Sequence, residues 1–284
     1  MKLKNIILLV ALSLIGLSSC INEKEMANQD GLVTFNATYE RPPQTKTVLE
    51  GLTPMWTPED KITVYDGVNN EFVNTEKSKT TASTSFKGKL EGKGRKHYLA
   101  AYPYNPDLTF SFFNKSIYDL YMPVEQVAVE NTYDPAAALA YAFTENYELS
   151  FKNAGSLIKF KIISEGVTSV TLRPNGEEII AGKFNLTYGE NPVYTITKGE
   201  KEIKLVGDFK KDAIYYIVTL PVTLTDGLTV LLNENIKTFS ESYQIDLARS
   251  GLINLGSLSL NPSESQPDTE EEDDAAVPST WSVK

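Results

Sequence analysis

The chain has 284 residues, a formal net charge of -10, one histidine and one cysteine. An acidic chain repels nucleic acid and anionic lipid headgroups, so we expect neither as a partner. One cysteine and one histidine are too few for a metal site built from these residues, and a single thiol cannot form an internal disulfide. The composition therefore predicts no nucleic-acid partner, no metal and no cofactor.

The N-terminal segment has the pattern of an export signal. Two lysines precede an apolar stretch from Ile6 to Leu17, which is too short to span a bilayer as a helix. Two serines and then Cys20 follow it. This pattern resembles the lipobox of bacterial lipoproteins, in which a signal peptidase cuts before the cysteine and its sulfur carries a diacylglycerol. The resemblance implies a signal peptide at residues 1–19 and lipidation of Cys20. The alternative is an ordinary secretory signal followed by a coincidental cysteine.

A polar segment at residues 20–30 is expected to tether the lipid to the folded chain. From residue 31 the pattern changes, because Val33, Phe35, Ala37 and Tyr39 alternate with polar residues. Alternation built from β-branched and aromatic residues is typical of a half-buried strand. Two prolines follow Arg41, and proline cannot donate to a β-ladder, so we expect the strand to end there.

Short apolar runs punctuated by glycine, proline, asparagine and aspartate recur as far as Leu260. Asp-Gly pairs, as at 66–67 and 226–227, indicate turns beside such runs. The spacing predicts an all-β fold made of antiparallel β-sandwiches. The further runs that we expect to form strands are Lys61–Tyr65, His97–Tyr102, Leu157–Ile162, Ser169–Leu172, Ala213–Leu220 and Leu228–Leu232.

One segment, Pro135–Ala142, is rich enough in alanine to be helical, with Asp134 as its cap, although an extended conformation is an equal alternative. A polar stretch follows it, and Leu149 then opens a new series of strands. We therefore predict two β-sandwich domains, at residues 31–146 and 147–260.

Beyond residue 260 the composition changes to proline, serine and acidic residues. Residues 270–274 form an uninterrupted acidic run, which repels itself and cannot contribute to a core. Some β character returns around Trp281 and Val283. We interpret residues 261–284 as an acidic tail that either is disordered throughout or carries a functional strand at its end.

No catalytic constellation is apparent. His97, which any Ser-His-Asp or Cys-His arrangement would have to use, begins a predicted strand and has no nucleophile-elbow motif beside it. Paired carboxylates could serve a glycosidase, but nothing in their spacing singles out a pair. The 15 tyrosines could stack on sugars, or equally serve as half-buried residues of small sandwiches. We predict that the protein has no catalytic residues.

Four ordered blocks, which span residues 31–260, carry a family resemblance. They are 33–37 with 45–47 and 55–65; 101–104; 133–135 with 149–160; and 215–221 with 226–228 and 253–256. This ordered set resembles the fimbrillin-like proteins, the lipoprotein precursors of type V pili in Gram-negative anaerobes.

The resemblance implies two transthyretin-like antiparallel β-sandwich domains in tandem and a non-enzymatic role as a pilus subunit at the outer membrane and cell surface. In that family an arginine- or lysine-specific protease removes the N-terminal segment with its first strand. An extended strand from a neighbouring pilus subunit then fills the opened groove by β-strand addition. Host molecules or glycans are further partners that the resemblance allows.

Carried over to this chain, the resemblance makes Val33, Phe35, Ala37 and Tyr39 the candidate removable strand. Arg41 is the candidate cleavage site. Pro42 directly follows it, and a proline after the scissile bond hinders most proteases, so Lys46 is the alternative.

The tail around Trp281 and Val283 is the candidate donor strand, but Pro278 shortens it. This favours a tip or accessory subunit, or an unprocessed surface lipoprotein on the same fold, over a stalk subunit. The alternative function is a carbohydrate-binding surface lipoprotein, and a glycosidase is a third possibility.

Overall fold

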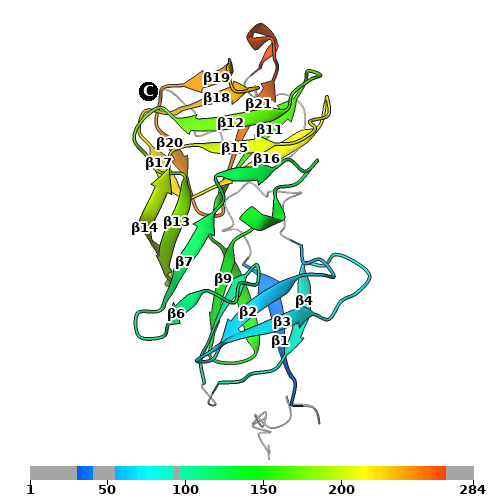
Figure 1. The fold of residues 1–284 in the computed structure, drawn as a ribbon, viewed down its shortest axis with the longest axis vertical. Helices are drawn as coiled ribbons and strands as arrows, with labels where there is room; N and C mark the ends of the chain where they lie inside the picture. Colours follow the sequence, from blue (N-terminus) through cyan, green and yellow to red (C-terminus); the bar gives the residue numbers. More distant parts are fainter. Residues whose placement is uncertain (1–30, 41–54, 93–95, 267–284) are drawn as a thin grey trace, which may run out of the picture.

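The computed structural model describes residues 31–40, 55–92 and 96–266. Within these ranges the regular secondary structure is almost entirely β-strand, which confirms the all-β prediction. These ranges also contain two short 3-10 helices, η2 (Pro135–Ala137) among the strands and η3 (Pro262–Glu264) after the last of them. None of the helices in these ranges is long and apolar enough to cross a membrane. Figure 1 shows an elongated molecule whose lower part holds the N-terminal strands.

The lower part is a sheet that closes on itself in the order β1-β10-β9-β5-β2-β3-β4. Closure depends on β1, which runs parallel to β10 on one side and antiparallel to β4 on the other. Its strands are β1 (Val33–Tyr39), β2 (Lys61–Tyr65), β3 (Asn69–Asn74), β4 (Ser83–Gly88), β5 (Tyr98–Tyr102), β9 (Ala140–Thr144) and β10 (Glu148–Asn153).

The upper part consists of four smaller sheets that pack around a second core, and one of these sheets extends down beside the closed sheet, where β6 lies (Figure 1). One sheet contains β6 (Thr109–Ser111), β7 (Ser116–Met122), β13 (Ala181–Thr187) and β14 (Val193–Glu200). Another contains β8 (Glu125–Val127), β12 (Ser169–Pro174), β15 (Ile203–Val206), β18 (Leu228–Leu232) and β19 (Ile236–Glu241). The last two contain β11 (Ser156–Ile162), β16 (Ile214–Thr219) and β21 (Leu252–Leu258), and β17 (Val222–Leu224) with β20 (Ile245–Leu247).

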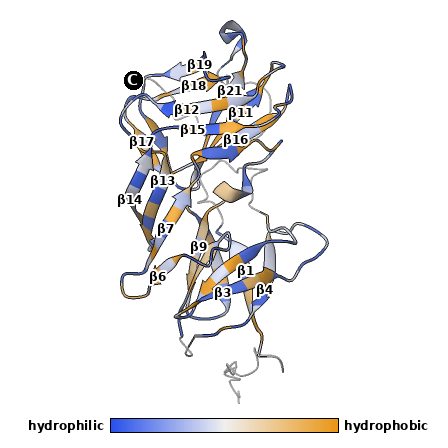
Figure 2. Cartoon of the chain, viewed as in Figure 1, coloured by the Kyte–Doolittle hydropathy of each residue, from blue (hydrophilic) through white to orange (hydrophobic). Residues whose placement is uncertain are grey.

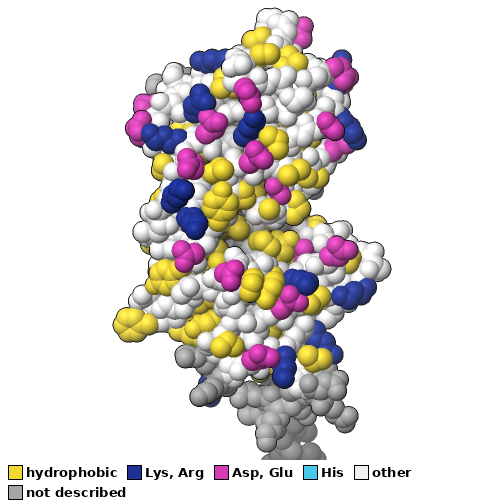
Figure 3. Space-filling view, in the orientation of Figure 1, with side chains coloured by type: hydrophobic (Ala, Val, Ile, Leu, Met, Phe, Trp, Pro, Cys, Tyr) yellow, Lys and Arg dark blue, Asp and Glu magenta, His cyan; other side chains and the backbone are white. Residues whose placement is uncertain are grey.

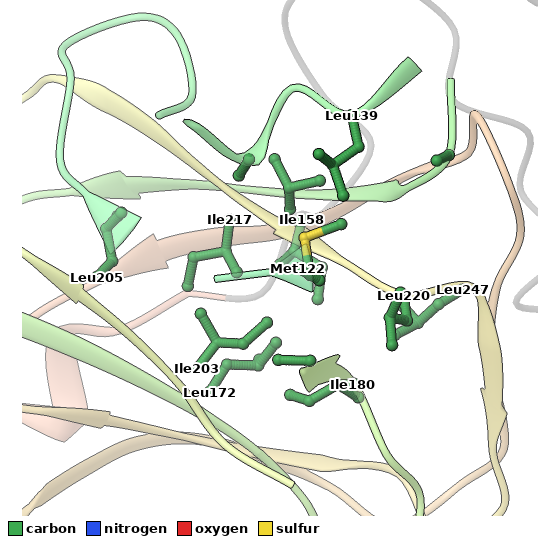
Figure 4. Packing of buried hydrophobic residues seen from close by; sticks show 14 of the residues in the cluster. Met122, Leu139, Ile158, Leu172, Ile180, Ile203, Leu205, Ile217, Leu220 and Leu247 are labelled. Carbon is green, nitrogen blue, oxygen red and sulfur yellow. The ribbon is translucent and has the colours of Figure 1, made fainter. Parts of the chain in front are cut away.

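Many strands alternate hydrophilic and hydrophobic residues along their length (Figure 2), so their apolar faces turn to a core. The lower core gathers side chains from all seven strands of the closed sheet and adds Trp56. In the upper core, Met122 of β7 lies with Ile158 of β11, Ile217 of β16 and Leu172 of β12 (Figure 4). Strands of separate sheets therefore share one apolar interior.

Each part of the molecule contains strands from both sides of residue 146 in the sequence. β10 follows residue 146 in the sequence and pairs with β1 and β9 of the closed sheet. β7 and β8 precede residue 146 and pair with β13 and β15 of the upper part. The division into transthyretin-like tandem domains at residues 146 and 147 stays a prediction.

The strands expected from alternation are confirmed, and β1, β2 and β18 match the predicted bounds to the residue. The alanine-rich segment 135–142 divides between both alternatives. Asp134 caps the single 3-10 turn of η2 by accepting a hydrogen bond from the Ala136 amide, and β9 then begins at Ala140.

Candidate functional site

The candidate removable strand is β1, and its side chains alternate between core and surface as the sequence predicts. Val33, Phe35 and Ala37 are buried, and Tyr39 is half-buried. Asn36 points to the surface, where its side-chain amide donates to the Glu148 carboxylate over 2.7 Å. One face of β1 thus belongs to the lower core, as period-two alternation requires.

Both edges of β1 are engaged by main-chain hydrogen bonds. The register pairs Ala37 with Leu149 of β10 and, on the other edge, with Thr84 of β4. Beyond the regular ladder, the Glu40 amide donates to the Phe151 carbonyl over 2.7 Å. The β1 position, meaning the place between β10 and β4, is therefore a slot with a paired strand on each side.

Aromatic rings surround the inward side chains of β1. The Phe35 ring makes edge contacts with three rings, those of Phe72, Tyr98 and Tyr147, with centroids 5.0–5.3 Å apart. Near the other end of the strand, Tyr39 stacks on Trp56 with centroids 4.5 Å apart. Aromatic pairs of this kind contribute about 0.5–1.5 kcal/mol each beyond the area they bury. The slot is thus apolar and shaped for specific side chains.

The end of β1 is fixed by an ion pair with the upper part of the molecule. Glu40 follows the last residue of β1 and pairs with Arg249, which lies between β20 and β21. The two side chains are only 17% and 21% exposed, respectively. Arg249 Nη1 donates to Glu40 Oε1, and Arg249 Nη2 donates to Glu40 Oε2 over 3.1 Å. This bidentate geometry is the strong form of an arginine–carboxylate contact.

Two further hydroxyl groups belong to this site. Ser250 Oγ donates to Glu40 Oε1 over 3.0 Å. The Tyr141 hydroxyl is buried and has no hydrogen-bond partner among the described residues. The pKa of Tyr141 is raised to about 12, chiefly by burial, with smaller opposing effects from Arg249, which lowers it, and Glu40, which raises it. The phenol is therefore protonated at neutral pH and can donate a hydrogen bond.

Several of the predicted site residues lie outside the described ranges. These are the lipidation site Cys20, the candidate cleavage sites Arg41 and Lys46, and the candidate donor residues Trp281 and Val283. The described part of the first segment ends at Glu40, directly before Arg41 in the sequence. The candidate cleavage site therefore follows the Glu40–Arg249 pair without an intervening residue.

Sequence reasoning missed the Glu40–Arg249 pair. The two residues are separated by 209 positions, and neither belongs to a motif. Trp56 lies in one of the family blocks, but nothing in the sequence indicates that Tyr39 stacks on it. Contacts between segments this far apart leave no periodic signal in a single sequence.

His97, the chain's single histidine, is about half exposed. Its Nδ1 lies 3.5 Å from a carboxylate oxygen of Glu145, and its ring stacks on Phe143 with centroids 6.1 Å apart. This is the environment of a histidine on the surface. On the face of the molecule in Figure 3, acidic and basic side chains are mixed, and hydrophobic side chains gather at its narrow middle. No continuous basic patch is visible on that face.

No family model matches the chain, and no curated protein matches it. Solved structures resemble it at low sequence identity. A "putative cell adhesion protein" of Bacteroides uniformis is 15% identical with a TM-score of 0.46, and the match covers 81% of this chain and 93% of that one. A protein of Bacteroides ovatus with the same description is 13% identical with a TM-score of 0.45, covering 78% and 91%. A fimbrial assembly protein of Parabacteroides distasonis is 10% identical with a TM-score of 0.34, covering 79% and 91%.

Proposed function

We propose that the chain is a non-enzymatic fimbrial surface lipoprotein, anchored in the outer membrane through Cys20 and assembled by exchange of its first strand. The observation that carries the proposal is the position of β1, which is paired on both edges and ends next to Arg41. After a cut behind Arg41, only hydrogen bonds and packing would still hold β1 to the rest of the protein. The ordered sequence blocks that resemble fimbrillin-like proteins support the same role.

Loss of β1 would give assembly its driving force. The edges of β4 and β10 would lose their partner, and unpaired edges are templates for strand addition. Val33 and Phe35 would also leave an apolar slot open to water. Reburying side chains of this size is worth about 3–6 kcal/mol in total. A strand from another pilus subunit would recover both contributions.

The subunit is proposed to sit at a tip or in an accessory position. A stalk subunit must donate a long alternating strand, and Pro278 interrupts the β character around Trp281 and Val283. Proline cannot donate to the ladder. The chain would therefore accept a strand from a neighbour more readily than it would donate one.

The test is to recover the protein from intact cells, sequence its N-terminus and examine it on gels without heating. We expect an N-terminus directly after Arg41 or Lys46, and SDS-resistant species of high mass that dissociate on heating. The control is the double variant R41Q/K46Q, which should keep β1 and run at a single mass. Protein that begins at Cys20 and is monomeric under every condition would contradict strand exchange.

Lipid attachment has its own test. Cys20→Ser should abolish incorporation of labelled palmitate and release the uncut protein from the membrane fraction. Unchanged labelling would show that Cys20 is not the lipid site. The carbohydrate-binding alternative stays a prediction, and binding of a defined glycan by protein that never assembles would favour it.

A further inference from the structure

Removal of β1 has a specific consequence for Arg249. Without Glu40, the guanidinium would keep only neutral partners in the described structure, the Asn153 carbonyl at 3.2 Å and Ser250 Oγ at 3.3 Å. Arg249 belongs to the upper part and would stay in place when β1 leaves. A charge that is four-fifths buried and unpaired is costly. The vacated slot would therefore contain an unbalanced cation at one end.

The groups around Arg249 form a carboxylate-binding site. The two guanidinium nitrogens bind the two oxygens of Glu40 in parallel, and Ser250 Oγ donates to one of them. Planar bidentate recognition by arginine is selective for carboxylates in fixed orientation.

We propose that Arg249 is a receptor for an acidic side chain of the incoming strand, and that it sets that strand's register in the β1 position. The inference rests on the proposed strand exchange and specifies the partner. The incoming strand carries apolar residues at the places of Val33, Phe35, Ala37 and Tyr39, followed directly by glutamate or aspartate.

The same site fixes the direction of the strand. Arg249 lies at the C-terminal end of β1, which runs parallel to β10 and antiparallel to β4. A strand inserted in the opposite direction would place its final acidic residue at the far end of the slot, away from Arg249. An alternating segment that ends in an acidic residue can satisfy the slot and the receptor together in one orientation.

The experiment uses the full chain with a protease site inserted after Arg41, cut so that both fragments are retained. Two labelled peptides are added in excess, one with the sequence of residues 31–40 and one with glutamine in place of its last residue. We expect the glutamate peptide to bind about 10- to 100-fold more tightly than the glutamine peptide. In Arg249→Gln the two affinities should agree within about threefold, since the charged partner is gone.

The matched control is Arg173→Gln, which removes the exposed ion pair between Arg173 of β12 and Glu202. This variant should keep the preference for the glutamate peptide over the glutamine peptide. Equal affinities for both peptides on the unsubstituted chain would overturn the receptor and leave strand exchange standing. Failure of both peptides to enter the slot would overturn strand exchange and the receptor with it.

Discussion

At the scale of single residues, the lower core depends on Phe35. Its side chain is fully buried and contacts three aromatic rings from β3, β5 and the segment before β10. Removing a buried ring loses its transfer free energy and leaves a cavity that rigid neighbours cannot fill. The chain also offers a matched exposed residue, because Phe113 is 97% exposed between β6 and β7.

We expect Phe35→Ala to lower the free energy of unfolding by about 3–5 kcal/mol. Phe113→Ala should change it by no more than about 0.5 kcal/mol, because its ring loses no packing. Urea denaturation of the full chain, followed by circular dichroism, measures both values. Similar effects of the two substitutions would show that β1 does not anchor the core.

What the sequence predicts at this scale is which face of a strand a residue occupies. Alternation placed Val33, Phe35 and Ala37 inside, and the structure buries all three. Alternation does not identify the partner of a charged residue at the end of a strand. The pairing of Glu40 with Arg249 depends on how β1 and the β20–β21 connection meet in space, which one sequence does not encode in any local pattern.

At the scale of elements, the Asp-Gly pairs predicted turns in addition to the strand bounds. The Asp226-Gly227 pair separates β17 from β18, as expected from the sequence. Gly227 has a φ of +75°, which glycine adopts readily and other residues adopt at a cost. A Cβ atom there would lie 2.1 Å from the Glu241 carbonyl oxygen. The turn therefore requires glycine for both conformation and space.

Gly227→Ala is expected to lower the free energy of unfolding by about 1–3 kcal/mol, from backbone strain alone, and by more if the backbone near Glu241 cannot move. The control is Gly189→Ala, where a Cβ would have no atom nearer than 3.9 Å. Thermal unfolding of the two variants compares them directly. Equal stability would mean that the turn rearranges without cost.

The alanine-rich segment shows why some elements could not be predicted. Asp134, followed by proline, caps a helical turn, but η2 ends after three residues because the chain must enter β9 beside β5. Ala140 and Ala142 are buried in the lower core. Tertiary packing of this kind overrides local helix propensity.

At the scale of the whole molecule, two apolar cores share a chain that crosses between them. β1 supplies Val33, Phe35 and Ala37 to the lower core and no buried side chain to the upper core. The residue after it, Glu40, contacts the upper part through the ion pair with Arg249 and the hydrogen bond from Ser250. Release of β1 should therefore weaken the two parts unequally.

Hydrogen exchange measured by mass spectrometry can follow this difference. The chain is cut after residue 41 and its first segment is separated under mild denaturant, which is then removed. We expect amides of β4 and β10 to lose protection, because β1 was their hydrogen-bond partner, while amides of β12 and β18 keep theirs. Adding a peptide with the sequence of residues 31–40 should restore protection in β4 and β10. Uniform loss throughout the chain would show instead that the two cores unfold as one unit, in which case removal of β1 would destroy the subunit rather than prepare it for a neighbouring strand.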